Sequence, residues 1–123
     1  MNPDEEYLQW SAGVLDRELQ ATLIPAADVA AIIGEDPAGL GLLTARRTDG
    51  QVGYPAWQFE AGKPLPGLRD VLAAFPRDFH PLDIERVMTT PDEELDGQSP
   101  REWLVAGASP ARVLAFVDDL GYL

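Results

Sequence analysis

The sequence has no cysteine, and its 123 residues include a single histidine. Without cysteine the chain cannot form a disulfide bond, a thiolate nucleophile or a cysteine metal site. His80 has no second histidine that could help it to bind zinc, and no nucleophile is apparent for it to activate. We therefore interpret His80 as an ordinary surface or turn residue, and we expect no metal and no cofactor.

Positive charge is scarce in this chain. Nine lysines and arginines stand against 21 aspartates and glutamates, which gives a formal net charge of −12 at pH 7. A charge of this size repels nucleic acid over most of the surface and favours a basic protein partner.

Long apolar runs are missing as well. No stretch is long enough to span a membrane, and Asp4, Glu5 and Glu6 give the N-terminus the wrong charge for a signal peptide. We therefore expect a cytoplasmic protein without a membrane partner. The hydrophobic content of 46% is enough for a folded core.

Catalytic patterns are absent too. Ser99 and Ser109 each precede a proline at an expected helix start, where capping explains a serine fully. Asp118 and Asp119 are adjacent, so on a helix they point about 100° apart and cannot form a carboxylate pair. We find no phosphate-binding glycine loop and no dinucleotide fingerprint, and we predict that the chain is not an enzyme.

The C-terminal residues predict two short helices with well-defined ends. Ser99 is a good N-cap, Pro100 fits the first helical position, and Glu102 completes a capping box. Gly107 ends this helix. The second helix starts after Ser109 and Pro110, and one of its faces is apolar, with residues at i, i+3, i+4 and i+7: Val113, Phe116, Val117 and Leu120. Gly121 ends it, and Tyr122 is expected to fold back onto Val117 in a Schellman cap.

The N-terminal residues predict further helices. We expect a helix over residues 3–21, whose apolar stripe packs either in the core or in a homodimer contact. Pro25 is expected to open a short helix that Gly34 ends, with Val29, Ile32 and Ile33 facing inward. A second short helix over residues 37–45 would complete a helix-turn-helix.

A hairpin is expected after this pair of helices. Asp49-Gly50 favours a tight primed turn within residues 46–54. Arg46 and Arg47 are the cations that this module offers to DNA phosphates. The expected reading helix carries acids and glycines, so we favour a scaffold role for it over direct reading of DNA.

The residues in the middle of the chain predict a boundary between an N-terminal and a C-terminal part. Residues 54–59 are aromatic and extended, and we expect Trp57 and Phe59 to fill the space between the parts. Residues 61–67 predict a linker stiffened by prolines, which divides the chain into residues 1–60 and residues 61–123. Helices over residues 68–75 and 81–88 follow.

Half of the chain resembles a known family. The run Leu95-x-Gly97-x-Ser99-Pro100-x-x-x-Leu104-x-x-Gly107, followed by Val113 and Leu114, is similar to the toxin-binding domain of the Xre/MbcA/ParS-like antitoxins. The resemblance extends to Tyr54-Pro55-Ala56-Trp57-Gln58-Phe59 and to Leu65-Pro66-Gly67-Leu68. It implies a mainly α fold, in which a helix-turn-helix-like module with a small β-hairpin precedes a helical toxin-binding domain.

The resemblance also implies a function. In that family this domain binds a cognate toxin, commonly a RES-domain enzyme that consumes NAD, and its C-terminal end blocks the active site. RES-type sites hold the anionic cofactor with arginines, so the acids near the C-terminus could occupy them. We assign toxin binding to Trp103, Arg112, Phe116, Asp118, Asp119, Tyr122 and Leu123.

Two other functions remain open at this point. The first is a DNA-binding transcriptional regulator that represses its own operon and uses Arg46 and Arg47 on operator DNA. The second is an enzyme, although no catalytic pattern favours it. The leading prediction is an antitoxin that forms a complex with a RES-domain toxin.

Overall fold

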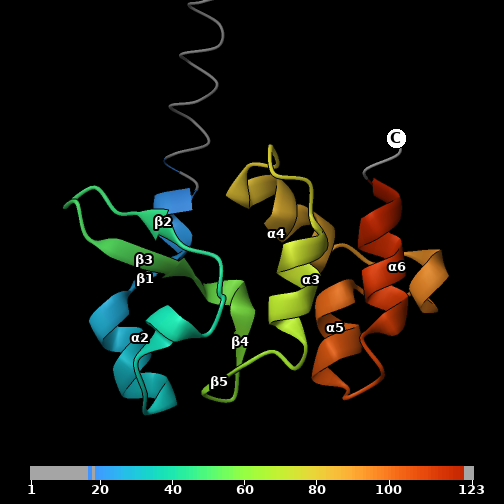
Figure 1. Ribbon diagram of the computed structural model, residues 1–123, viewed down its shortest axis with the longest axis horizontal. Helices are drawn as coiled ribbons and strands as arrows, with labels where there is room; N and C mark the ends of the chain where they lie inside the picture. Colours follow the sequence, from blue (N-terminus) through green and yellow to red (C-terminus); the bar gives the residue numbers. More distant parts are fainter. Residues whose placement is uncertain (1–16, 18, 121–123) are drawn as a thin grey trace, which may run out of the picture.

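The structure is a computed structural model that describes residue 17 and residues 19–120. Helices and small antiparallel sheets alternate along the chain, so the fold is mixed and the expected mainly α class holds only loosely. Figure 1 shows the larger sheet and α2 toward one end of the long axis, with α5 and α6 toward the other. Helices α3 and α4 lie between these two ends.

A three-stranded antiparallel sheet forms the N-terminal part. Residues 19–22 are the end of a helix that leads directly into β1 (Leu23–Pro25), a strand that we did not predict. Strand β3 (Val52–Pro55) is central, with β1 on one side and β2 (Ala45–Arg46) on the other. Most of the helix expected over residues 3–21 lies outside the described residues. In the described part of the chain, no helix is long and apolar enough to cross a bilayer.

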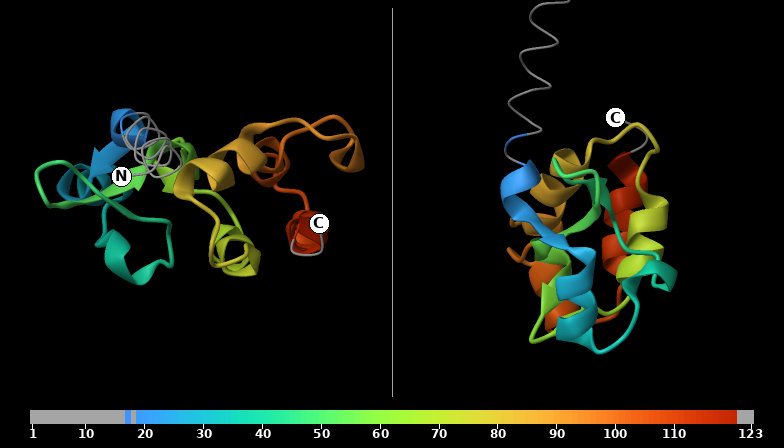
Figure 2. Two further views of the ribbon diagram at one scale, coloured as in Figure 1. Left: turned by 90° about the horizontal axis from the view of Figure 1, so that it is seen from above. Right: turned by 90° about the vertical axis from the view of Figure 1, so that its left-hand side faces the viewer.

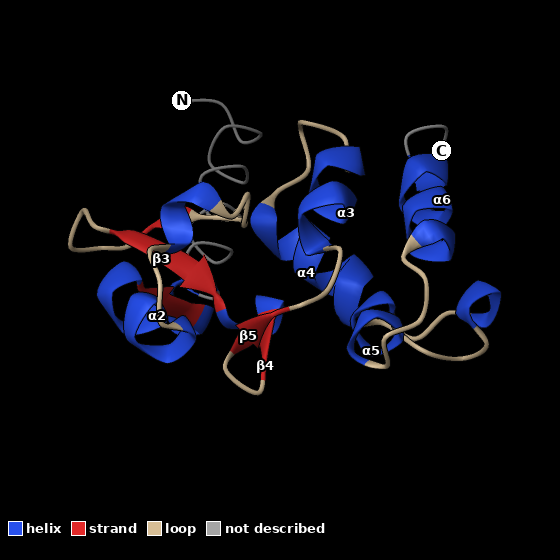
Figure 3. Cartoon of the chain, turned by 60° about the horizontal axis from the view of Figure 1, so that its bottom comes forward, coloured by secondary structure: helices blue, strands red, loops and turns tan. Residues whose placement is uncertain are grey.

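Helix α2 (Ala26–Ile33) packs against β1 and β3 (Figure 3). It starts after Pro25, as predicted, because proline supplies a helical φ and needs no hydrogen-bond partner there. Gly34 ends it in the left-handed region at φ 80°, and the Gly34 N–H donates to the carbonyl of Ala30. Val29 is buried, but Ile32 is 52% exposed, so the inward position predicted for Ile32 is wrong.

The predicted helix over residues 37–45 is absent, and with it the helix-turn-helix. A single 3-10 turn, η1 (Pro37–Gly39), takes its place, and the Asp36 carboxylate accepts a hydrogen bond from the Ala38 N–H at its start. Glycine weakens a helix, and Gly41 lies at φ 70°, outside the right-handed helical region. The backbone beyond it is bonded to another segment of the chain, and this tertiary contact outweighs the helical pattern of the leucines.

The predicted hairpin between β2 and β3 is confirmed, but its turn differs. The Gly50 N–H donates to the Arg47 carbonyl, and the Arg47 N–H donates to the Gln51 carbonyl. In this loop only Gly50 has a positive φ, of 84°, whereas a primed turn of the type expected needs two such residues. The connection is therefore a three-residue loop in which a turn is followed by a left-handed glycine.

The segment expected as a linker forms a second hairpin. After the 3-10 turn η2 (Ala56–Gln58), strand β4 (Phe59–Glu60) pairs with β5 (Lys63–Pro64). Residues Ala61 and Gly62 make the reversal, at φ 52° and 76°. Figure 3 shows this hairpin between the larger sheet and the helices. The extended strand or arm expected over residues 54–59 is therefore interrupted at η2, and the division of the chain at residue 60 stays a prediction.

The C-terminal part is a small helical assembly. Its elements are α3 (Leu68–Ala74), α4 (Pro81–Thr89), η3 (Glu93–Leu95), α5 (Pro100–Val105) and α6 (Ala111–Leu120). Helix α3 packs on α6 and α4 packs on α5, which gives two layers when the molecule is seen from above (Figure 2). The buried core comprises Trp57, Leu65, Leu68, Val71, Phe75, Ile84, Met88, Leu95, Leu104, Val113 and Val117.

Gln58 joins the N-terminal segment to this core. Its side chain is fully buried, and its Oε1 accepts a hydrogen bond of 2.7 Å from the Leu43 N–H. Its Nε2 donates to the carbonyls of Leu43 at 2.9 Å and Pro55 at 3.2 Å. Leu42 and Leu43 thereby lie against the core, and Trp57 is buried in it, as predicted. The side-chain amide of Gln58 therefore supplies the backbone of Leu43 with the hydrogen bonds that a strand or a helix would otherwise provide.

We predict that Gln58→Leu lowers the free energy of unfolding by about 2–4 kcal/mol, because the backbone groups that bond Gln58 would lose their partners. Chemical denaturation followed by circular dichroism measures the change. The matched control is Gln51→Leu at an exposed position, with an expected change within about 0.5 kcal/mol. Equal stability of the two variants would contradict the role given to Gln58.

Candidate partner-binding site

The capping box at the start of α5 sets the geometry of the C-terminal part. The Ser99 hydroxyl accepts a hydrogen bond from the Glu102 N–H, and a Glu102 carboxylate oxygen accepts one from the Ser99 N–H, both at 3.1 Å. Pro100 occupies the first helical position, as predicted. Ser99 is only 2% exposed, so capping and burial account for this serine. Gly107 follows the helix at φ 77°, which is the predicted stop.

Arg101 links α5 to the β4 region, and we did not predict it. Its Nε donates to the Trp57 carbonyl and its Nη2 to the Phe59 carbonyl, both at 2.7 Å. Nη2 also lies 2.8 Å from a carboxylate oxygen of Glu60. The partners are more than 40 residues away along the chain, and no local spacing pattern signals a contact of that range.

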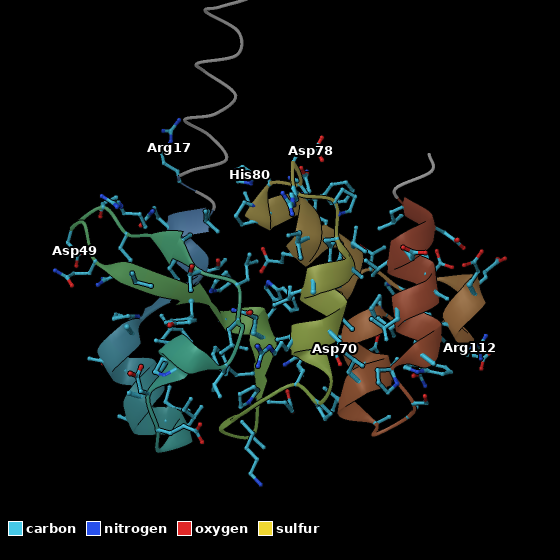
Figure 4. The ribbon with its side chains drawn as sticks, viewed as in Figure 1. Arg17, Asp49, Asp70, Asp78, His80 and Arg112 are labelled. Atoms are coloured by element: carbon cyan, nitrogen blue, oxygen red, sulfur yellow. The ribbon has the colours of Figure 1, made fainter. Side chains whose placement is uncertain are left out.

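Trp103 and Arg112, two of the residues predicted to bind toxin, contact each other. The Trp103 Nε1–H donates to the Ser109 carbonyl at 2.8 Å, which fixes the indole against the α5–α6 turn. The Arg112 guanidinium carbon lies 4.8 Å from the centre of the Trp103 ring, within the range of a cation–π contact. Arg112 also donates to the Glu94 carbonyl and, at 3.4 Å, to a carboxylate oxygen of Asp96. This pair thus connects α5, α6 and η3 at the outer end of the molecule (Figure 4).

The apolar face predicted for the last helix is confirmed in α6. Val113 and Val117 are fully buried, and Leu114, Phe116 and Leu120 pack partly buried against the core. Asp118 and Asp119 are exposed in the last turn, which contains no basic residue. The remaining predicted toxin contacts, Tyr122 and Leu123, lie outside the described residues. The predicted contact of Tyr122 with Val117 and the stop at Gly121 lie there with them.

Phe116 borders a hollow of about 300 Å³ that the C-terminal pattern alone did not indicate. The other lining residues come from the end of α4 and the start of η3: Arg86, Val87, Thr90 and Asp92. The apolar pattern of α6 places Phe116 on the helical face that packs against the core. It does not predict that Phe116 lies near the end of α4, because that proximity depends on how the helices pack together.

The predicted DNA contacts, Arg46 and Arg47, lie at the end of the molecule that carries β2, opposite the end that carries α6 (Figure 1). Together with Arg17 they surround a hollow of about 430 Å³ beside β2. Gln20 fixes this region, since its amide donates to the Arg46 carbonyl and accepts from the Thr48 N–H. Arg47 makes an ion pair of 2.8 Å with Asp49. In Figure 4, Arg17 and Asp49 lie toward one end of the long axis and Arg112 toward the other.

The acids, His80 and Tyr54 have side chains with metal-binding or acid–base chemistry. Among the described residues, no group of three or more histidines, cysteines or acids could hold a metal ion. His80 is the N-cap of α4, where its Nδ1 accepts a hydrogen bond from the Leu82 N–H at 3.1 Å, in agreement with a turn residue. Burial raises the pKa of the Tyr54 phenol above 10.0, and the negative charge of Asp36 raises it further. Tyr54 is therefore a neutral core residue at physiological pH.

Comparison with protein-family models, with curated proteins and with solved structures finds no match to this chain.

Proposed function

We propose that this chain is an antitoxin-like protein that binds a RES-type, NAD-consuming toxin and blocks its active site with the C-terminal end. The resemblance of its C-terminal half to the Xre/MbcA/ParS-like toxin-binding domains motivates the proposal. The observation that carries it is the charge at the end of α6. Asp118 and Asp119 are exposed in the last turn of this helix, and no cation in that turn offsets them.

These acids are unfavourable for the helix itself. The C-terminal end of a helix carries partial negative charge, so each exposed acid there costs roughly 0.3–1 kcal/mol at low salt. Helix formation alone therefore does not favour two acids in this turn. A partner that presents positive charge removes the repulsion, and the arginines of a RES-type cofactor site are such charges.

The side chains next to these acids are already held in place by contacts within the chain. Arg112 is held by Trp103, by the Glu94 carbonyl and by Asp96, while Phe116 lies one turn further along α6. A surface that is already ordered loses little conformational entropy when a partner binds. Trp and Arg are also the residue types that contribute most to protein interfaces. These features favour protein recognition over catalysis by the chain itself.

The proposal is tested by NAD consumption of a candidate RES-domain enzyme, sought among the genes next to the one that encodes this chain. We predict that the full chain stops turnover, whereas a version lacking residues 118–123 still binds the enzyme but leaves it active. Turnover is measured as NAD loss, and binding by calorimetry. Should both versions inhibit equally, the block lies elsewhere, and if neither binds, the proposed function is wrong.

A substitution pair separates specific charge from net charge. The double variant with Asp118→Asn and Asp119→Asn should raise the inhibition constant by at least tenfold, because it removes both acids from the end of α6. The matched control carries Asp78→Asn and Asp83→Asn, which change the same net charge at exposed positions near α4. We expect this control to inhibit within about twofold of the native chain.

DNA binding as an operon regulator is the second candidate function. The observation that favours it is the gathering of Arg17, Arg46 and Arg47 around one hollow, in a protein with nine cations in all. Two features weigh against it. The second helix of the expected helix-turn-helix is absent, and Arg47 is paired with Asp49.

We expect the isolated chain to bind a duplex from its own upstream region only weakly, with an affinity that falls steeply with salt. Fluorescence anisotropy at two salt concentrations measures this. Tight binding at physiological salt, weakened by Arg46→Ala and left unchanged by Arg77→Ala, would instead favour the regulator.

A further inference from the structure

The hollow between α4 and α6 has an apolar floor and a fixed rim. Val87 and Phe116 form the floor, and both pack against the core on their inner side. The Thr90 hydroxyl donates to the Arg86 carbonyl within α4, and a carboxylate oxygen of Asp92 accepts from the Glu94 N–H at 2.9 Å. These bonds hold the rim in place without a partner.

The volume of the hollow suits one side chain. At about 300 Å³ it lies at the small end of the range for ligand pockets, and it is open to solvent on one side. Hot spots in protein interfaces are commonly formed by a single large side chain that enters a pocket of this kind. The hollow therefore fits an apolar side chain that projects from a partner surface.

The charge around the hollow is negative. The last turn of α4 lines it with the negative end of the helix dipole. Asp92 lies on the rim, and Glu93 and Glu94 follow it in η3. Arg86 is the one cation among the described residues that line the hollow, and these three acids stand against it. Arg112 nearby is already engaged by Trp103, Glu94 and Asp96. Charge complementarity therefore favours a basic segment.

We infer that this hollow is the docking site for a basic segment of the partner enzyme, which inserts one aliphatic or aromatic side chain between Val87 and Phe116. The inference rests on the proposed function and adds to it a second point of contact, on α4 and η3. Binding here would hold the enzyme independently of the acids at the end of α6. The truncated chain that no longer blocks turnover would then still bind.

Two adjacent threonines allow a matched test. Thr89 is the last residue of α4 and Thr90 is its C-cap; both are exposed, and each hydroxyl donates to the carbonyl four residues earlier. Only Thr90 lines the hollow. Thr90→Trp would fill it, and Thr89→Trp places the same bulk on a neighbouring face at the same cost in local hydrogen bonding.

The probe is the same candidate RES-domain enzyme that tests the proposed function, with dissociation constants from calorimetry and the fold of each variant checked by circular dichroism. We expect Thr90→Trp to weaken binding at least tenfold, and Thr89→Trp to stay within twofold of the native chain. Equal binding by the two variants overturns the inference and leaves the proposed function standing. If the native chain does not bind the enzyme, both fall together.

A second pair of variants tests the charge of the segment and covers the case in which tryptophan disturbs α4. Thr90→Arg adds a positive charge at the rim and should weaken binding by at least tenfold at low salt, with a smaller effect at high salt. Thr89→Arg is its control. Tighter binding by Thr90→Arg would mean that the partner segment is acidic, and it would contradict the inference.

Discussion

The side-chain amide of Gln58 is fully buried and bonds three backbone groups of two other residues, Leu43 and Pro55. A buried backbone group without a partner costs about 1–3 kcal/mol, so this amide decides how the irregular segment before β2 can lie. It brings Leu42 and Leu43 against the helical core. Arg101 binds the backbone on either side of Gln58, because it donates to the carbonyls of Trp57 and Phe59. The small sheet and the helices are therefore joined by polar side chains that reach backbone groups.

This arrangement affects what the C-terminal part can do. Because Arg101 and the capping box orient α5, the turn after α5 places Trp103 and Arg112 in contact, and α6 follows from that turn. Val113 and Val117 are buried on the core side of α6. What remains outside is an apolar edge at Phe116, an acidic end and a rim of acids from η3. These features carry the proposed binding surface, and they lie at the opposite end of the molecule from Arg17 (Figure 4).

Local signals were readable from the sequence, and distant ones were not. The capping box, the stops at Gly34 and Gly107 and the Asp49-Gly50 hairpin depend on residues within a few positions of one another, and the structure has these features, with a different turn in the hairpin. The helix expected over residues 37–45 failed because Gln58, fifteen residues from Leu43, binds the backbone there. The expected linker failed because Lys63 and Pro64 pair with β4. At the candidate site the sequence predicts residues of α5 and α6, and their binding role stays a prediction. The sequence does not predict the neighbouring end of α4, because its position depends on packing.

The central claim is that α6, together with the ends of α4 and η3, is the surface that meets a RES-type enzyme. Hydrogen exchange of this chain, measured by mass spectrometry with and without a candidate RES-domain enzyme, tests the claim most directly. The account predicts slower exchange in residues 86–96 and 111–120 when the enzyme is present, and unchanged exchange in the β2–β3 hairpin. Protection confined to the hairpin, with residues 86–96 and 111–120 unaffected, would contradict it.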